Sequence, residues 1–306
     1  MMQSNQKLNC LLDSAIVLSK ADMARLSAGY NVELFSPHNP NEEQLSNCDA
    51  VLLHSRLSRD SLLKMSKCKY IGIRAHNTDY IDRKLAEELG ISYKGIPQLS
   101  QTSVAEHTFA LIFAVTKQLK FSHNNVIHGN WRSGLTPNYE LASKKLGIIG
   151  NGQIGKQVGA IGRALGMEIL VASKLGEEKE GELPLGQVIQ QSDILTLHLS
   201  TKGNSVFFDK EKIARMKPNA ILINTSRGSL LDYKFLEESL RAGKLFGAGL
   251  DVFPEEPLKE TSLCDLTNVI CTPHVAYYTE ETIASMNETL ITNLEEFHKA
   301  VEDKEN

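Results

Sequence analysis

The sequence has few cysteines, no long apolar run and no strong charge of either sign. Its five cysteines are scattered, and no C-x-x-C pair indicates zinc, so we expect reduced, mostly buried thiols and no metal site. The longest apolar stretch, residues 109–115, is far too short to span a bilayer. With a formal net charge of −4, the surface favours neither nucleic acid nor an anionic membrane as a partner.

The beginning of the chain gives no sign of export. The first ten residues, MMQSNQKLNC, lack a positively charged stretch followed by an apolar run, so we predict a cytoplasmic protein. With 42% hydrophobic and 23% charged residues, the composition is that of a globular protein. The length of 306 residues suits two domains of ordinary size.

Short apolar runs alternate with helix-patterned stretches along the whole chain. This alternation predicts an α/β protein in which parallel strands are joined by helices. The expected strands are 9–13, 32–35, 50–54, 70–74, 146–149, 168–172, 194–198, 220–224, 247–252 and 269–272, with early helices at 41–46 and 59–67.

Two further helices are expected where domains join. Ser103 and Glu106 fit a capping box, and the apolar stretch behind them predicts a helix buried in a core or in the interface of a homodimer. Apolar residues at helical spacing in 283–297 predict a last helix that returns to the first domain. We therefore expect a discontinuous substrate domain, 1–99 with 281–306, and a dinucleotide-binding domain, 100–280.

The sequence GIIGNGQIG, ending at Gly155, predicts a dinucleotide-binding turn between a strand and a helix. Gly150 would allow the tight turn, Gly152 would let the backbone approach a pyrophosphate, and Gly155 would let the helix pack closely on the strand. The backbone N–H groups of Gln153 and Ile154 would face the phosphates.

The residue that reads the adenosine ribose normally follows the second strand as Asp or Glu. Ser173 stands there, followed by Lys174, so no carboxylate repels a 2′-phosphate and the lysine can attract one. This slightly favours NADP over NAD. The alternative is that Lys174 pairs with one of the glutamates at 177, 178, 180 and 182.

Three later motifs follow strands: INTSRG at 223–228, GLDVFPEEP at 249–257 and TPHVA at 272–276. Together with the glycine turn, and in this order, they resemble the D-isomer-specific 2-hydroxyacid dehydrogenase family. The resemblance is strong from residue 102 to 276 and loose in the first 70 residues. It implies a Rossmann-type cofactor domain and a flavodoxin-like substrate domain, both doubly wound parallel sheets, with hydride transfer between a nicotinamide and a small 2-keto or D-2-hydroxy acid.

Three residues have the chemistry that this reaction needs. Arg227 offers a planar set of donors for the substrate carboxylate. Histidine is the type of side chain that ordinarily titrates near neutrality, so His274 can supply the proton. Glu256 can pair with this histidine and favour its protonated form. The resemblance implies the same roles for these three residues. It selects Glu256 over Glu255 because the catalytic carboxylate of the family directly precedes the proline.

Further roles are implied by the resemblance alone. Asp251 matches a residue that bonds the nicotinamide carboxamide, and His198, Thr225 and Ser226 match positions that line the cofactor groove. Structural capping by His198 and Ser226 is an equal alternative.

Residues 74–82 match a loop whose backbone amides bind the substrate carboxylate, so His76, Asn77 and Thr78 are substrate-site candidates. Asn77 stands where the family usually has glycine, and asparagine tolerates positive φ. Residues 97–100 match the hinge loop.

The sequence resembles two branches of the family, which act on different substrates. Tyr277, in the Tyr-Tyr-Thr sequence after the histidine motif, resembles D-lactate dehydrogenases and is a substrate-site candidate. Ser173 and Lys174 instead resemble hydroxypyruvate and glyoxylate reductases. The alternative function is an NAD(H)-sensing protein similar to the co-repressors of this family, without significant turnover.

Overall fold

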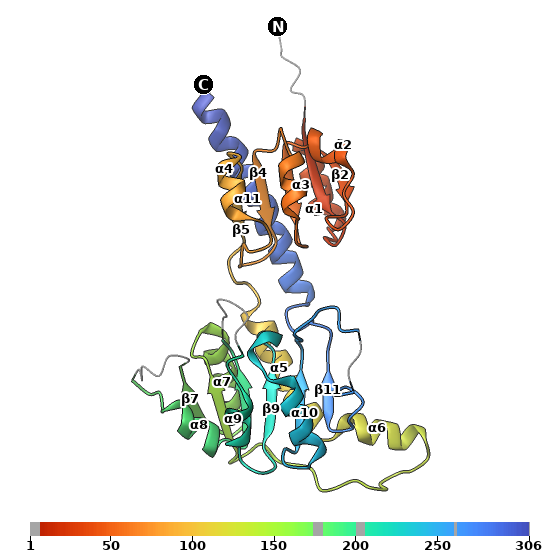
Figure 1. The fold of residues 1–306 in the computed structure, drawn as a ribbon, viewed down its shortest axis with the longest axis vertical. Coiled ribbons are helices and arrows are strands. Elements are labelled where there is room, and N and C mark those ends of the chain that lie inside the picture. The colour runs from red at the N-terminus through yellow and green to blue at the C-terminus, as the bar shows by residue number, and fades with distance from the viewer. Residues whose placement is uncertain (1–6, 174–179, 200–205, 260–261, 306) are drawn as a thin grey trace. The chain divides into compact units, whose positions relative to one another are not determined.

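The computed structural model describes residues 7–173, 180–199, 206–259 and 262–305 (Figure 1). The chain folds into two compact units. Unit 1 comprises residues 1–99 and 279–306, and unit 2 comprises residues 100–278. Both contain parallel strands joined by helices, which confirms the predicted α/β class with two parallel-sheet domains.

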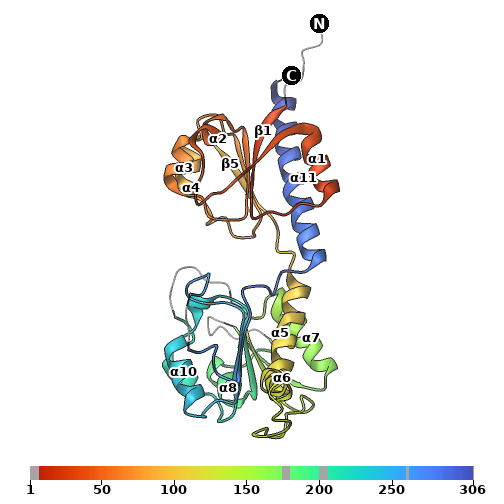
Figure 2. The same ribbon diagram turned by 90° about the vertical axis from the view of Figure 1, so that its right-hand side faces the viewer.

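Unit 1 is a five-stranded parallel sheet in the order β2-β1-β3-β4-β5. This is the flavodoxin-like order. Helices α2, α3 and α4 cover one face, and α1 and α11 cover the other (Figure 2). The elements are β1 (Leu8–Asp13), α1 (Lys20–Gly29), β2 (Tyr30–Phe35), α2 (Glu42–Asn47), β3 (Ala50–Leu53), α3 (Arg59–Lys64), β4 (Tyr70–Ile73), α4 (Arg83–Glu88), β5 (Ser92–Gly95) and α11 (Glu280–Glu305).

The last helix, α11, packs on the unit 1 sheet. The Phe297 ring stacks on buried Tyr70 of β4 with the ring centroids 4.8 Å apart. Arg25 of α1 forms an ion pair with Glu295 at 2.5 Å. Burial of apolar side chains, including fully buried Leu290, Ile291 and Leu294, supplies most of the stabilisation, because exposed ion pairs contribute little.

Unit 2 is a six-stranded parallel sheet in the order β11-β10-β9-β8-β6-β7. Helices α5 and α7 cover one face, and α8 and α10 cover the other (Figure 2). The elements are α5 (Gln101–Thr116), α6 (Leu119–Ile127), β6 (Lys145–Ile149), α7 (Gln153–Ala164), β7 (Glu168–Ala172), α8 (Leu185–Gln191), β8 (Ile194–Leu197), α9 (Lys210–Ala214), β9 (Ile221–Asn224), η1 (Gly228–Leu230), α10 (Tyr233–Arg241), β10 (Gly247–Leu250) and β11 (Val269–Cys271).

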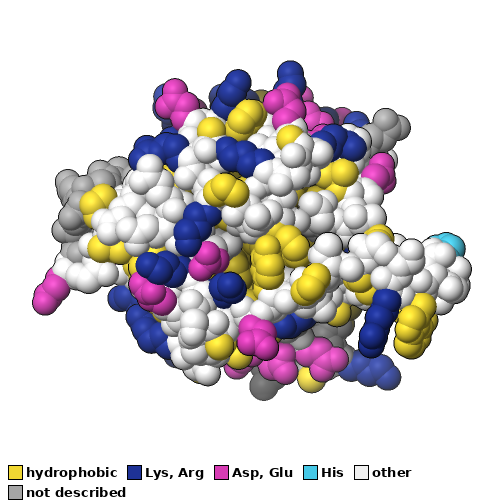
Figure 3. All heavy atoms as spheres, turned by 90° about the horizontal axis from the view of Figure 1, so that it is seen from below, with side chains coloured by type: hydrophobic (Ala, Val, Ile, Leu, Met, Phe, Trp, Pro, Cys, Tyr) yellow, Lys and Arg dark blue, Asp and Glu magenta, His cyan; other side chains and the backbone are white. Residues whose placement is uncertain are grey.

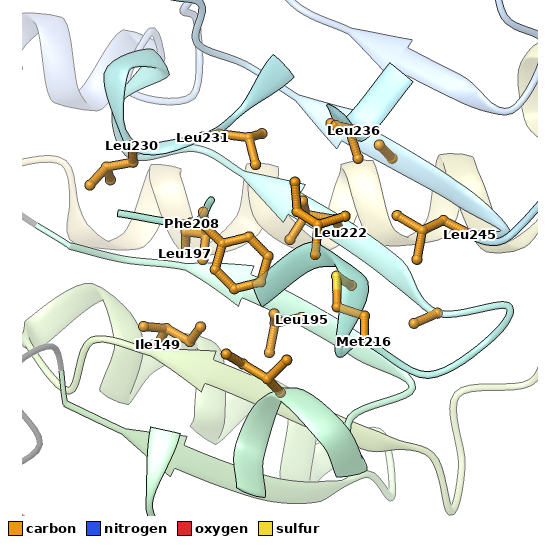
Figure 4. Packing of buried hydrophobic residues seen from close by; sticks show 14 of the residues in the cluster. Ile149, Leu195, Leu197, Phe208, Met216, Leu222, Leu230, Leu231, Leu236 and Leu245 are labelled. Carbon is orange, nitrogen blue, oxygen red and sulfur yellow. The ribbon is translucent and has the colours of Figure 1, made fainter. Parts of the chain in front are cut away.

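The central strands of unit 2, β6, β8, β9 and β10, are buried on both faces, as parallel strands between helices must be. On the α8 and α10 face, Leu195, Leu197 and Leu222 pack around Phe208, and all four are fully buried (Figure 4). This packing gives the strand ends, where the predicted site residues lie, a rigid support.

Helix α5 contradicts one expectation and agrees with another. It begins at Gln101, and Ser103 lies inside the first turn with its hydroxyl donating to the Ser100 carbonyl at 3.1 Å, so the capping-box prediction is wrong. Apolar side chains of α5 pack in the core of its own unit, where Ile112 is fully buried. Of the two predicted alternatives, core or dimer interface, the structure therefore shows the core.

The cysteines are also not as predicted. Cys264 and Cys271 form a disulfide with their Cα atoms 6.0 Å apart, whereas Cys10, Cys48 and Cys68 are free and buried. The expectation of reduced thiols throughout is wrong because the loop before β11 folds back on itself, which a spacing of seven residues does not reveal.

Candidate functional site

The predicted residues of unit 2 follow the carboxyl ends of neighbouring strands. The glycine turn follows β6, Ser173 follows β7, His198 follows β8, Thr225 to Arg227 follow β9, and His274 follows β11. Ligands of open α/β sheets bind at this edge, above all where the strand order reverses. In unit 2 that reversal lies at β6, which has β7 on one side and β8 on the other.

The glycine turn after β6 is built around two close backbone contacts. Gly150 has φ +109°, and a Cβ there would lie 2.1 Å from the His198 carbonyl oxygen. A Cβ on Gly155 would lie 2.1 Å from the Gly150 carbonyl oxygen. Only glycine fits at either position.

The space beside Gly152 fits a dinucleotide pyrophosphate. A Cβ on Gly152 would meet no atom within 4 Å, so the chain leaves room at the point where a phosphate would approach. Gly152 is also the N-cap of α7 and provides no side-chain cap, so the N–H groups of Gln153 and Ile154 at the start of the helix are available to an anion.

The other cofactor candidates surround this turn. His198 is half-buried, with Nε2 2.9 Å from the Thr196 hydroxyl, and burial lowers its pKa to about 4, so it is neutral at pH 7. Thr225 and Ser226 are buried. Ser173 is half-buried, and Lys174 lies outside the described residues.

The loop that carries Arg227 is held by a buried asparagine at the end of β9. Asn224 Oδ1 accepts from the backbone N–H of Ser226 at 3.1 Å, and its Nδ2 donates to the Arg227 carbonyl at 3.0 Å. The Arg227 side chain is exposed, and Nη1 donates to the Ser226 carbonyl at 2.7 Å. The Arg227 side chain is thus exposed to solvent, while the backbone that carries it is held in place by Asn224.

The Arg227 loop lies directly against the loop of Glu256. A Cβ on Gly228 would lie 1.9 Å from the Phe253 carbonyl carbon, so the two backbones are in contact. The N–H of Phe253 in turn donates to Glu256 Oε1 at 2.9 Å. Glycine at 228 therefore allows the backbone of the Arg227 loop to lie against the loop that carries Glu256.

His274 and Glu256 form a hydrogen-bonded pair with Nδ1 and Oε2 2.6 Å apart. Because a carboxylate accepts, Nδ1 carries the proton and Nε2 is left to interact with a ligand. Partial burial would raise the pKa of Glu256, but the bonds from His274 and from the Phe253 N–H outweigh it and lower the pKa. The side chain of His274 is 40% exposed, so a small molecule can reach it.

Asp251 holds the backbone of the His274 loop. Its fully buried carboxylate accepts from the N–H of Val275 and of Ala276, each at 2.9 Å, and from the Thr272 hydroxyl at 2.6 Å. Burial would raise the pKa of Asp251, but these bonds and one from His107 lower it. His274 itself has φ +55°, so this network stabilises an unfavourable backbone conformation.

His107 of α5 extends the same network. Its Nε2 lies 3.0 Å from the Thr272 hydroxyl and 3.5 Å from Asp251 Oδ1. Since Thr272 donates its proton to Asp251, Nε2 of His107 is the donor to Thr272.

The substrate candidates of unit 1 lie in the loop after β4. His76 and Asn77 are exposed and Thr78 is half-buried. Asn77 is not among the described residues with positive φ, so the expected glycine-like conformation is wrong. Its side-chain oxygen instead accepts from the Asp79 N–H at 3.0 Å, which closes a different turn. In unit 2, the Tyr277 ring meets the His274 ring edge-on at 6.0 Å.

Sequence reasoning missed the residues that support the site. Asn224 bonds to the nearby Ser226 and Arg227, whereas His107 and Thr272 act through contacts with residues distant in the chain. So does Tyr233, whose hydroxyl donates to the Val252 carbonyl just before the Glu256 loop. No local spacing marks His107, Thr272 or Tyr233. Among the described residues, no group of three His, Cys, Asp or Glu side chains is placed to hold a metal ion.

Comparison with known proteins identifies the family. Residues 109–276 match the model of the D-isomer specific 2-hydroxyacid dehydrogenase NAD binding domain. The chain belongs to this family. It is 34% identical to a glycerate dehydrogenase of Methylorubrum extorquens over 278 residues, which cover 87% of this chain and 88% of the relative.

Solved structures that match this chain over nearly their whole length have the same fold. A D-lactate dehydrogenase from Aquifex aeolicus, complexed with NAD and lactic acid, superposes with a TM-score of 0.81 at 30% identity and covers 95% of this chain and 96% of its own. An acyclic imino acid reductase, in complex with NADPH and D-Arg, gives 0.81 at 29% identity, covering 95% and 97%. The chain is thus a nicotinamide-dependent oxidoreductase that acts on the CH–OH group of 2-hydroxy acids, as the sequence predicted.

Proposed function

We propose that the protein reduces small 2-keto acids of the pyruvate, hydroxypyruvate or glyoxylate type to D-2-hydroxy acids, with His274 as the proton donor. The observation that carries this assignment is the 2.6 Å contact between His274 Nδ1 and Glu256 Oε2, next to the loop of Arg227. Relatives named glycerate dehydrogenase and hydroxypyruvate reductase support the substrate class.

Each residue then has a separate task. The bound nicotinamide cofactor supplies the hydride. Arg227 binds the substrate carboxylate with its fork of N–H donors. Protonated His274 donates from Nε2 to the oxygen at C2 as negative charge develops there. Glu256, which its lowered pKa leaves ionised at neutral pH, accepts from Nδ1 and keeps the imidazole ring oriented.

The glycine turn, with Gln153 and Ile154, would hold the pyrophosphate, and His198, Thr225 and Ser226 would line the groove. We assign Asp251 to positioning the His274 loop, since the observed bonds of its carboxylate are to that loop, Thr272 and His107. The family role at the nicotinamide carboxamide stays a prediction. So do the substrate contacts of His76, Asn77, Thr78 and Tyr277.

The activity is tested by following oxidation of NADH and of NADPH with pyruvate, glyoxylate, hydroxypyruvate and bulkier 2-keto acids. We expect turnover with at least one small 2-keto acid and slower turnover as the side chain grows. Tight NADH binding with no oxidation across the panel would contradict the proposal and favour a sensing protein like the co-repressors.

We further propose that the protein is a homodimer in the cytoplasm, with the interface on α6 instead of α5. Leu119, Val126 and Ile127 are exposed on one face of α6, and Trp131, just beyond the helix, is 70% exposed. The lobe at the right of Figure 3, where α6 projects in Figure 1, bears exposed hydrophobic side chains. A patch of this kind is typical of an interface. No helix of the described residues is long and apolar enough to cross a membrane.

A further inference from the structure

Tyr233, the first residue of α10, connects the ends of two neighbouring strands. Its hydroxyl donates to the carbonyl of Val252, which lies just beyond the end of β10. Asn224, the last residue of β9, forms a side-chain hydrogen bond with the same hydroxyl. The start of the helix that carries the tyrosine is itself fixed, because the Asp232 carboxylate caps α10 by accepting from the N–H of Phe235 at 3.0 Å.

One peptide group connects the tyrosine to Glu256. The carbonyl of this group belongs to Val252 and accepts from Tyr233, and its N–H belongs to Phe253 and donates to Glu256 Oε1 at 2.9 Å. A trans peptide group is planar, with its oxygen and its N–H pointing in opposite directions. A rotation that took the carbonyl away from Tyr233 would therefore also withdraw the N–H from Glu256, whose other oxygen holds His274 Nδ1.

The second partner of the hydroxyl leads to Arg227. Nδ2 of Asn224 donates to the Arg227 carbonyl at 3.0 Å, and the amide has a second hydrogen for the tyrosine oxygen. Burial raises the pKa of Tyr233, and the bond from Asn224 opposes this rise without cancelling it. The phenol is therefore protonated at neutral pH, so it can accept from Asn224 while its own hydrogen is donated to the Val252 carbonyl.

We propose that Tyr233 is a positioning residue that holds the segments of Arg227 and Glu256 in a fixed relation, so that the substrate carboxylate and the proton donor His274 are correctly spaced. The inference rests on the proposed function for the tasks of these three residues. Val252 is only 1% exposed, so loss of the hydroxyl would leave a buried carbonyl without this donor and its peptide group less restrained.

Tyr233→Phe tests the proposal because it removes the hydroxyl and keeps the ring, which lies against that of Phe253 with the centroids 6.0 Å apart. With the best 2-keto acid of the panel, we expect kcat to fall by ~10-fold or more and KM to rise by ~3-fold or more, because both segments lose a restraint. The NADH dissociation constant should stay within about twofold of wild type, since the glycine turn is unchanged.

Tyr30→Phe is the matched control in unit 1. It removes another hydroxyl from a buried tyrosine, one that lies 2.6 Å from His298 Nδ1. We expect this variant to have a lower melting temperature but to keep kcat and KM within about twofold of wild type. A loss of turnover confined to Tyr233→Phe thus separates positioning from a general loss of stability.

Nuclear magnetic resonance makes the test independent of turnover. The nitrogen chemical shifts of the His274 ring, assigned by their loss in His274→Gln, report whether Nδ1 keeps its bond to Glu256. We expect these shifts to change in Tyr233→Phe and to match the wild type in Tyr30→Phe.

Wild-type shifts in Tyr233→Phe, or a wild-type kcat, would overturn the proposal. Changed shifts in both Tyr233→Phe and Tyr30→Phe would also overturn it, because the effect would then be a general loosening of the fold. Changed shifts in Tyr233→Phe alone, in an enzyme whose wild type reduces no 2-keto acid, would contradict the proposed function but support the contact of Tyr233 with the Glu256 segment.

Discussion

The backbone N–H of His274 donates to the backbone carbonyl of Asp251 at 2.8 Å, so the candidate proton donor is tied directly to the end of β10. The Asp251 carboxylate holds the next two backbone amides as well. The position of the imidazole is therefore set by a buried anion that does not itself need to touch the substrate.

Asp251→Asn tests this support. It replaces one oxygen by an NH₂ group that would face an N–H or O–H donor, so we expect the unfolding free energy to fall by about 1–3 kcal/mol. A displaced imidazole should lower kcat by roughly 100-fold. Urea unfolding and steady-state kinetics measure the two effects. Asp265→Asn, the same change at an exposed position before β11, should lower neither the unfolding free energy nor kcat. A fully active Asp251→Asn enzyme would show that the network does not position His274.

Gly150 and Gly152 give a matched pair of alanine variants. Alanine at 150 would put Cβ 2.1 Å from the His198 carbonyl in a positive-φ conformation, so we expect a lower melting temperature and no NADH binding. Alanine at 152 meets no protein atom within 4 Å, so the protein should keep its melting temperature and lose NADH affinity alone. Wild-type NADH affinity in Gly152→Ala would contradict the pyrophosphate assignment.

Burial of neutral His198 predicts a pH dependence of stability. Its pKa is lowered to about 4 in the folded protein, whereas an unfolded histidine titrates near pH ~6.5, so the unfolded state takes up the proton first as the pH falls. The unfolding free energy should therefore decline between these two values, with a contribution on the order of 2 kcal/mol from this residue. Urea titrations at several pH values should show a smaller decline in His198→Gln. Identical pH profiles would exclude the effect.

The strands could be predicted because each is a short apolar run bounded by polar residues, and the burial of both faces of the sheets explains these runs. β5 was missed because Ser92–Gly95 is a polar edge strand with exposed residues, which carries no apolar signal. Arg227, Glu256 and His274 could be proposed because each lies in a short motif directly after a strand.

The supporting contacts could not be predicted. The bonds of Asp251 to Ala276 and of Asn151 to Glu182 join positions 25 and 31 residues apart, and only the packed fold brings them together. The disulfide of Cys264 and Cys271 depends on how the loop between them folds, whereas the turn at Asn77 is a local contact with Asp79 that the expectation of a glycine-like conformation overlooked.

The exposed face of α6 predicts that one charge will disrupt the dimer. Val126→Asp places a carboxylate among Leu119, Ile127 and Trp131, and burying it in an interface without a partner is costly. Light scattering after size exclusion should give twice the mass of one chain for the wild type and a single chain for the variant. Leu63→Asp, on an exposed site of α3, should leave the mass unchanged. A dimeric Val126→Asp protein would place the interface elsewhere.

The most direct test of the account is the His274→Gln variant, assayed with NADH and the best 2-keto acid of the panel. Glutamine is neutral and cannot deliver the proton, so we expect reduction to fall by at least ~100-fold while the NADH dissociation constant stays within about twofold of wild type. Turnover at the wild-type rate with intact NADH binding would contradict the assignment of His274 as the proton donor.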